Sequence, residues 1–268
     1  MSLGRDPFSL PISLYVIERP HSYSMSEPFQ REETIFEAAV ELPPEQRVAD
    51  VVILNVLGII HGRRGEWTEA TRNFTRVVEL LPSDHDACHS FAPLLAQSDP
   101  EAYRRLCAQI LRQFGRTSNP AIAERMARDC LILPPSAADL ETISKMVDAA
   151  VAAGPSHPFW DYFQFVKGLS EYRNSRFADA AEWLQKVAAH ENDPDRTVEA
   201  YMALAMAQHQ VKQVDEARAT LAKGLQIADT KLGKFGSPQF NDQIAAQMLM
   251  REASELIEGG SKTNTETK

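Results

Sequence analysis

Two histidines and a cysteine gather in SDHDACHSF, residues 83–91, where imidazole nitrogens and a thiolate could bind a metal ion. His85, Cys88 and His89 stand at i, i+3 and i+4, so on a helix they would share one face and could hold zinc with a fourth ligand. The spacing matches no familiar metal signature, and the segment must also supply the residues that start a helix. We therefore expect no metal site and no cofactor.

The cysteines could also do nucleophilic chemistry, as Cys107 would if a histidine and an aspartate activated it. No strained nucleophile turn surrounds any cysteine or serine, so we expect no enzyme. Cys88, Cys107 and Cys130 are too few and too scattered for a disulfide framework. They predict buried thiols in a reducing compartment, and hence a cytoplasmic protein.

Composition narrows the class of partner. The 268 residues are 44% hydrophobic and 24% charged, with a formal net charge of −9 and a pI near 5.3. An acidic chain with only short basic pairs does not favour nucleic acid, which is bound through clustered Lys and Arg. The most apolar stretch, VVILNVLGII at 51–60, stops at His61-Gly62-Arg63-Arg64, far short of the roughly 18 to 20 residues that a membrane-spanning helix needs. We expect a protein or peptide partner, with no membrane; the oligomeric state stays open.

The elements that position these residues are predicted to be short helices. Asp99-Pro100, Asn119-Pro120 and Ser237-Pro238 each place a capping side chain before a proline at the first helical position, and 83–86 and 136–139 resemble capping boxes. Apolar residues recur three or four apart between these signals. About twelve helices and no convincing strand follow, which predicts an all-α chain of antiparallel hairpins.

Three hairpins repeat the same spacing: a small residue, a second small residue 12 positions later, and a large apolar residue four positions beyond. The three sets are Gly58, Ala70 and Phe74; Gly168, Ala180 and Leu184; Ala205, Ala217 and Leu221. Small residues let two helix backbones approach at their crossing, while the large side chain fills the space beside it.

At these residues the chain resembles the tetratricopeptide repeat, a 34-residue helix–turn–helix with an aromatic near its seventeenth position, here Trp67 and Phe177. The resemblance implies a right-handed α-solenoid of about five hairpins, with an N-terminal helix and a C-terminal capping helix. Clear repeats are expected near 51–84, 161–193 and 198–231, and degenerate ones near 85–118 and 119–156. Pro93 should bend or end its helix. Within a repeat domain at 28–258, the helix 238–258 should close the stack, with an irregular extension at 1–27 and a disordered tail at 259–268.

A second resemblance concerns YRRLCAQILRQFGRTSNPAIAERMARDCLILPP, FWDYFQFVKGLSEYRNSRFADAAEWLQKV and EAYMALAMAQHQVKQVDEARATLAKGLQIADTKL. These segments are similar to the C-terminal repeat region of serine/threonine protein kinases of planctomycetes and verrucomicrobia, and EETIFEAAVELPPEQR at 32–47 is similar to a segment ahead of their kinase domain. The chain has no Gly-rich phosphate loop, HRD or DFG motif, so we carry over a scaffold role and no kinase activity.

Counting from the small residue as the eighth position of the repeat identifies the side chains that would line the concave face. The predicted partner-binding residues are Asn55, Arg63, His89, Tyr162, Phe165, Tyr172, Arg173, Met202 and His209. Such residue types are enriched in binding hot spots, although Phe165 and Tyr172 could instead pack between helices. The leading hypothesis is a non-catalytic scaffold in bacterial signalling; the alternatives are a regulatory remnant or accessory module of a kinase system, and an enzyme, which would need a deep pocket with convergent polar groups.

Overall fold

The structure is a computed structural model that describes residues 47–190, 193–232 and 240–263, with side chains for 51–190, 193–232 and 240–259. The described residues form eleven helices and no strand, which confirms the all-α class. The expected extension at 1–27, most of the segment at 32–47 and the Ser237-Pro238 cap lie outside the described residues. The helices are α2 (Arg47–Arg64), α3 (Trp67–Leu80), α4 (His85–Ser98), α5 (Pro100–Phe114), α6 (Pro120–Leu131), α7 (Ala137–Val151), α8 (Trp160–Arg173), α9 (Phe177–Ala188), α10 (Pro194–Gln210), α11 (Val214–Lys231) and α12 (Phe240–Thr263).

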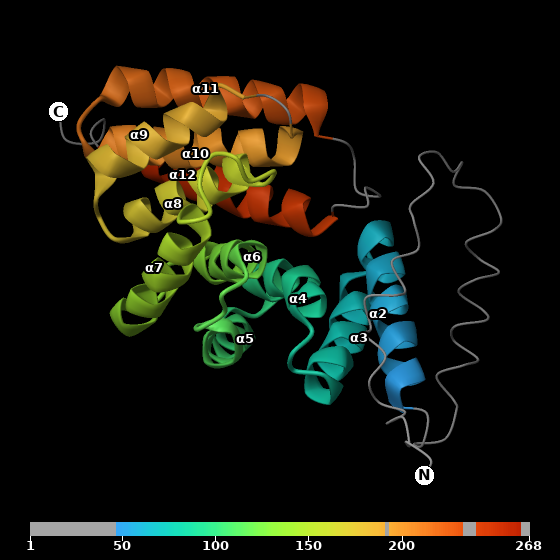
Figure 1. Ribbon diagram of the computed structural model, residues 1–268. Coiled ribbons are helices and arrows are strands. Elements are labelled where there is room, and N and C mark those ends of the chain that lie inside the picture. The colour runs from blue at the N-terminus through green and yellow to red at the C-terminus, as the bar shows by residue number, and fades with distance from the viewer. Residues whose placement is uncertain (1–46, 191–192, 233–239, 264–268) are drawn as a thin grey trace, which may run out of the picture.

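The first ten of these helices pair into five hairpins, each made of an even-numbered helix and the odd-numbered helix that follows it (Figure 1). Each hairpin packs on the next. The first helices of successive hairpins also touch directly, α4 on α6, α6 on α8 and α8 on α10. We call the surface formed by these four helices the inner face. The architecture is a stack of helical hairpins, as the repeat spacing predicted.

Side-chain caps start five of the helices. Asp99, Asn119 and Ser136 accept hydrogen bonds from the backbone at the starts of α5, α6 and α7, as predicted. Asp84, within the predicted box at 83–86, caps α4, and Asp193 caps α10. Each cap satisfies amide donors that a helix start leaves unpaired.

The small residues stand where two helices of one hairpin cross. A Cβ on Gly168 would lie 2.5 Å from Leu184 Cγ, and one on Gly58 would lie 2.9 Å from the ring of Phe74. Both distances are shorter than packed carbon atoms tolerate, so a side chain at either position would push the helices apart. This contact explains the spacing in the sets that begin at Gly58 and Gly168.

The same three hairpins turn identically, seven positions after the small residue. Gly65, Ser175 and Lys212 have φ of 75°, 62° and 69°, and the amide after each bonds to a carbonyl five residues earlier, as in Glu66 N to His61 O at 2.9 Å. This is the Schellman termination, which favours glycine because other residues are strained in the left-handed region. Only the first hairpin has that glycine.

Two expectations concern helix ends. Of the bend or end expected at Pro93, the end is wrong, because α4 continues to Ser98 with the proline buried among core residues. At the C-terminus α12 continues to Thr263, so residues 259–263 are helical rather than part of a disordered tail. Gly259 and Gly260 each weaken a helix by only about 1 kcal/mol, which does not suffice to end α12.

The last helix does not simply close the end of the stack. Besides α10 and α11, α12 contacts α4 and α2, which belong to the opposite end of the chain (Figure 1). Apolar side chains around α12 are buried, among them Ile244, Leu249, Ala253 and Ile257. The helix therefore runs along the inner face, where these apolar side chains are buried. None of the described helices is long and apolar enough to cross a membrane.

Candidate protein-binding face

A buried cluster of charged side chains lies at the centre of the inner face. Arg128 of α6 donates from Nε to Glu199 of α10 at 3.3 Å, bonds the same carboxylate through Nη2, and donates from Nη1 to Asp242 of α12 at 2.7 Å. Arg196 donates to Glu199 at 3.1 Å. Arg128 is 2% exposed and Glu199 0%. One guanidinium therefore joins three helices through charge-assisted hydrogen bonds.

Arg173, at the end of α8, forms a second connection. Its guanidinium donates to the carbonyls of Leu131 at 3.2 Å and Ile132 at 3.1 Å, at the end of α6, and to Glu252 of α12 at 2.7 Å. A cation is favourable at a helix C-terminus, where carbonyls lack partners. Arg173 thus ties α6, α8 and α12 together, and it is one of the residues predicted to line the concave face.

Further carboxylates surround the cluster. His89 Nδ1 lies 2.9 Å from Asp129, which is fully buried, and its Nε2 lies 4.0 Å from Asp242. Burial raises the pKa of Glu124 although Arg196 and Arg128 oppose the rise. Burial, together with the charges of Asp242 and other carboxylates, raises the pKa of Asp195 to about 7. The cluster holds more acids than bases.

Aromatic rings border the cluster on α8. The Arg196 guanidinium lies 4.5 Å from the centre of the Tyr162 ring and 4.7 Å from that of Phe165, within cation–π range. Tyr162 donates its hydroxyl to Asp193 at 2.9 Å. Burial, followed by the charge of Asp193, raises the pKa of Tyr162 to about 12, so the hydroxyl stays a donor at neutral pH.

The structure brings only some of the predicted residues together. His89, Tyr162, Phe165 and Arg173 belong to the cluster or its borders. Phe165 and Met202 are fully buried, and Tyr172 packs on Phe177 of its own hairpin at 5.6 Å between ring centres. Asn55, Arg63 and His209 are half-buried on α2 and α10. Packing between helices is thus the role seen for Phe165, Met202 and Tyr172.

The repeat pattern does not indicate the residues that complete the cluster. Arg128 and Asp129 lie in one of the two degenerate repeats, and Asp242 and Glu252 lie on a helix expected at the end of the stack. The one available signal was in MARDC, residues 126–130, where two charged residues stand among the apolar ones of α6. Charges on the buried side of a helix indicate partners on another element.

The residues of the SDHDACHSF segment point to different neighbours. Cys88 is fully buried, and burial raises the pKa of its thiol to about 12. His85 lies 3.3 Å from Arg125, whereas His89 is bonded to Asp129. Among the described residues no group of three histidine, cysteine or acidic side chains is placed to hold a metal ion.

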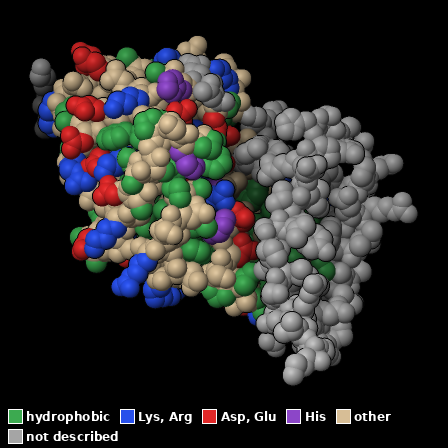
Figure 2. Space-filling view, viewed as in Figure 1, with side chains coloured by type: hydrophobic (Ala, Val, Ile, Leu, Met, Phe, Trp, Pro, Cys, Tyr) green, Lys and Arg blue, Asp and Glu red, His purple; other side chains and the backbone are tan. Residues whose placement is uncertain are grey.

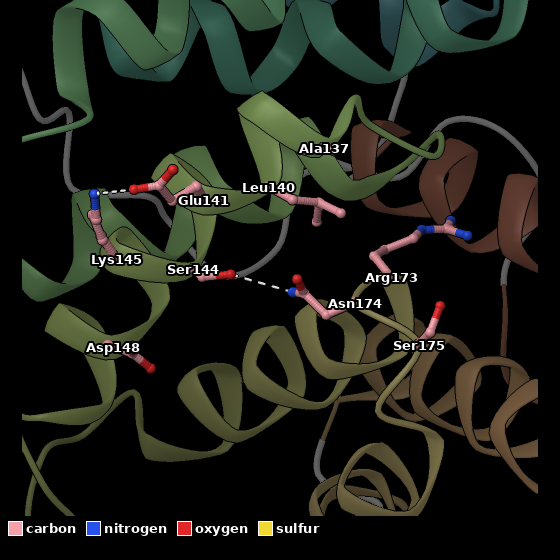
Figure 3. A pocket seen from close by; sticks show the side chains of 9 residues that line it. All are labelled: Ala137, Leu140, Glu141, Ser144, Lys145, Asp148, Arg173, Asn174 and Ser175. Atoms are coloured by element: carbon pink, nitrogen blue, oxygen red, sulfur yellow. Dashed lines mark hydrogen bonds and ion pairs between the residues drawn. The ribbon is translucent and has the colours of Figure 1, made fainter.

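A wide pocket of about 550 Å³ lies between α7 and the turn from α8 to α9 (Figure 3). Its polar side chains bond to one another: Lys145 donates to Glu141 at 2.7 Å, and Asn174 donates to Ser144 at 3.2 Å. Arg173 at its edge bonds Glu252. The pocket is broad and open, and its polar groups do not converge on a common point as those of an enzyme site do.

No family model and no curated protein matches the chain. Among solved structures, Cut9 in the Cut9–Hcn1 hetero-tetramer of the APC/C is similar with a TM-score of 0.50 and 15% identity, over 83% of this chain and 45% of that one. A tetratricopeptide protein of Thermus thermophilus, TTC0263, gives 0.47 and 18% over 74% and 99% of the two chains. MamA of Desulfovibrio magneticus gives 0.44 and 16% over 69% and 98%. At these identities the likeness concerns the fold alone, a stack of helical hairpins.

Proposed function

We propose that this chain is a non-catalytic scaffold that binds a segment of another protein along its inner face. The buried charge network of Arg128, Glu199 and Arg196 is the observation that carries the proposal. A stack that only had to be stable would gain as much from apolar side chains of similar size, because removing charges from water offsets most of their attraction. Arginine and tyrosine at the same face are the side chains that binding hot spots favour.

The finer part of the proposal places the scaffold in the cytoplasm, in bacterial signalling. Its support is the similarity of the three repeat segments to the C-terminal region of serine/threonine protein kinases, together with three free, buried thiols. The second candidate remains an accessory module that regulates a kinase carried on another polypeptide. Acidic and basic side chains intermingle on the described part of the surface that Figure 2 shows, and such a mixed surface suits a protein partner.

Photo-crosslinking tests the face directly. A photoreactive phenylalanine replaces Tyr162, which borders the cluster, or in a matched control Trp183 on the outer helix α9; both positions are half-buried. In host lysate we expect a crosslinked protein from the first position and none from the second. A kinase among the products, identified by mass spectrometry, would support the signalling role. Products only from position 183 would contradict the proposal.

A further inference from the structure

Helix α12 lies on the inner face in the manner of a bound helical ligand. It contacts α10, α11, α4 and α2, and it is joined to α6 and α8 by Arg128 and Arg173 (Figure 1). The face that we propose for a partner is therefore already occupied within the chain. The contacts of α12 show what kind of partner the face accepts.

The contacts follow a simple pattern along α12. Asp242 meets Arg128 near the start of the helix, and Glu252 meets Arg173 ten residues later, which is about 15 Å along a helix axis. Between them Ala245 and Leu249 face Phe165 of α8 across a narrow gap. An amphipathic helix with two carboxylates at this separation matches the two arginines of the inner face.

The fit of α12 is incomplete. Gln243 on α12 and Glu124 on α6 are 4% and 7% exposed, and each has a side-chain oxygen, Oε1, without a hydrogen-bond donor among the described residues. Asp195 also has a buried oxygen for which the described residues provide no donor, and the carboxylate of Asp242 is one of the charges acting on it. Buried acceptors without donors weaken an interface. A helix that keeps the two carboxylates and adds donors would bind this face better than α12 does.

We propose that the inner face is a receptor for an amphipathic helix of a partner protein with two carboxylates ten residues apart, and that α12 is the intramolecular occupant which this helix replaces. The inference rests on the proposed function and names its partner class. A tethered helix competes at a high effective concentration, so the partner's apparent affinity is its intrinsic affinity multiplied by the fraction of molecules in which α12 is released. Loosening α12 should raise the apparent affinity in proportion to the increase in that fraction.

The test uses the full chain and, as probe, a fluorescein-labelled peptide with the sequence of residues 240–259. Glu252→Arg places two cations against each other at Arg173 and loosens α12, whereas Glu255→Arg changes an exposed carboxylate of the same helix and serves as control. We expect the Glu252→Arg protein to bind the peptide at least about tenfold more tightly than the wild type or the control. A peptide that itself carries Glu252→Arg should lose this gain.

Hydrogen exchange of the α12 amides accompanies each titration. The proposal requires faster exchange in the Glu252→Arg protein; unchanged protection, or fast exchange without peptide binding, would overturn it. Light scattering tests whether a second copy of the chain occupies the inner face. A dimer formed by exchanging α12 between two copies would also overturn the proposal. If Glu252→Arg does not fold, Glu252→Gln removes the ion pair of α12 with Arg173 and leaves Arg173 available to the peptide, and the same outcomes apply.

The two proposals fail in different ways. A lysate protein crosslinked at position 162 while α12 stays protected would retain the scaffold and remove this inference. Peptide binding to the loosened chain, with no lysate protein crosslinked at position 162, would retain the displacement of α12 and remove the scaffold role.

Discussion

Replacing Arg128 by methionine should destabilise the chain strongly. The change removes three charge-assisted contacts, two with Glu199 and one with Asp242, and leaves Glu199 with Arg196 as its cationic partner. Methionine fills much of the same volume, so the cost comes from the carboxylate that stays buried. Breaking such a buried pair costs about 3–5 kcal/mol, and we expect a loss of free energy of unfolding in that range at neutral pH.

The loss should depend on pH. Burial already raises the pKa of Glu199 above its ordinary value, while Arg128 lowers it, so the variant raises that pKa further. An acid whose folded pKa lies above its unfolded value stabilises the fold at low pH and loses this contribution as the pH rises through the folded pKa. The deficit of the variant should therefore be larger at about pH 8 than at about pH 5.

Urea unfolding followed by circular dichroism measures the effect, with two reference variants. Arg76→Met removes an exposed ion pair with Glu79, in which both side chains are 58% exposed, and should cost less than about 0.5 kcal/mol. Adding Glu199→Gln to Arg128→Met should recover part of the loss, because the buried carboxylate that has lost Arg128 no longer carries a charge. A loss below about 1 kcal/mol, well under the cost of breaking a buried pair, or an equal loss at the two pH values, would refute the reasoning.

Three further predictions use the same unfolding assay. Gly168→Ala should destabilise by about 1–2 kcal/mol through its clash with Leu184, whereas Gly259→Ala, with nothing within 4 Å of its Cβ, should be neutral or stabilising; equal effects would contradict the packing argument. Lys212→Gly should stabilise by about 1 kcal/mol, because glycine relieves the φ of 69°, and a loss would count against strain at this turn. Asp195→Asn should raise the free energy of unfolding by on the order of 1 kcal/mol at about pH 8 and change it little at about pH 4. The reason is that the folded wild-type protein, in which Asp195 has a pKa of about 7, loses stability as the pH rises from about 4 to 7. A difference that does not depend on pH would be inconsistent with that pKa.

Local signals in the sequence predicted most of the hairpins. Asp99, Asn119 and Ser136 cap the helices that they were expected to cap, because a cap involves only a side chain and the amides two or three residues later. The spacing from Gly168 to Leu184 identified a real helix crossing. The left-handed turns at Ser175 and Lys212 could not be predicted from the sequence, since neither residue is a glycine. The closure of the hairpin imposes this conformation on them.

The candidate site was only partly predictable from the repeat register. Counting from a small residue placed Tyr162 and Arg173 on the inner face, and extending the register into the degenerate repeat near 85–118 added His89. The same counting could not place Arg128, because the hairpin of α6 departs from the motif. It also could not show that Phe165, Met202 and Tyr172 are occupied with packing, since burial depends on what the neighbouring hairpins present.

The sequence by itself determined that the chain is helical, where most helices begin, and which small residues lie at the crossings, because these features depend on residues within one hairpin. Only the tertiary structure decided where α12 lies and which charges meet. Arg128 is 71 residues from Glu199 and 114 from Asp242, and such pairs depend on how each hairpin is oriented on the next. Because those orientations accumulate along the stack, no spacing within a single repeat could predict that the last helix returns to the inner face.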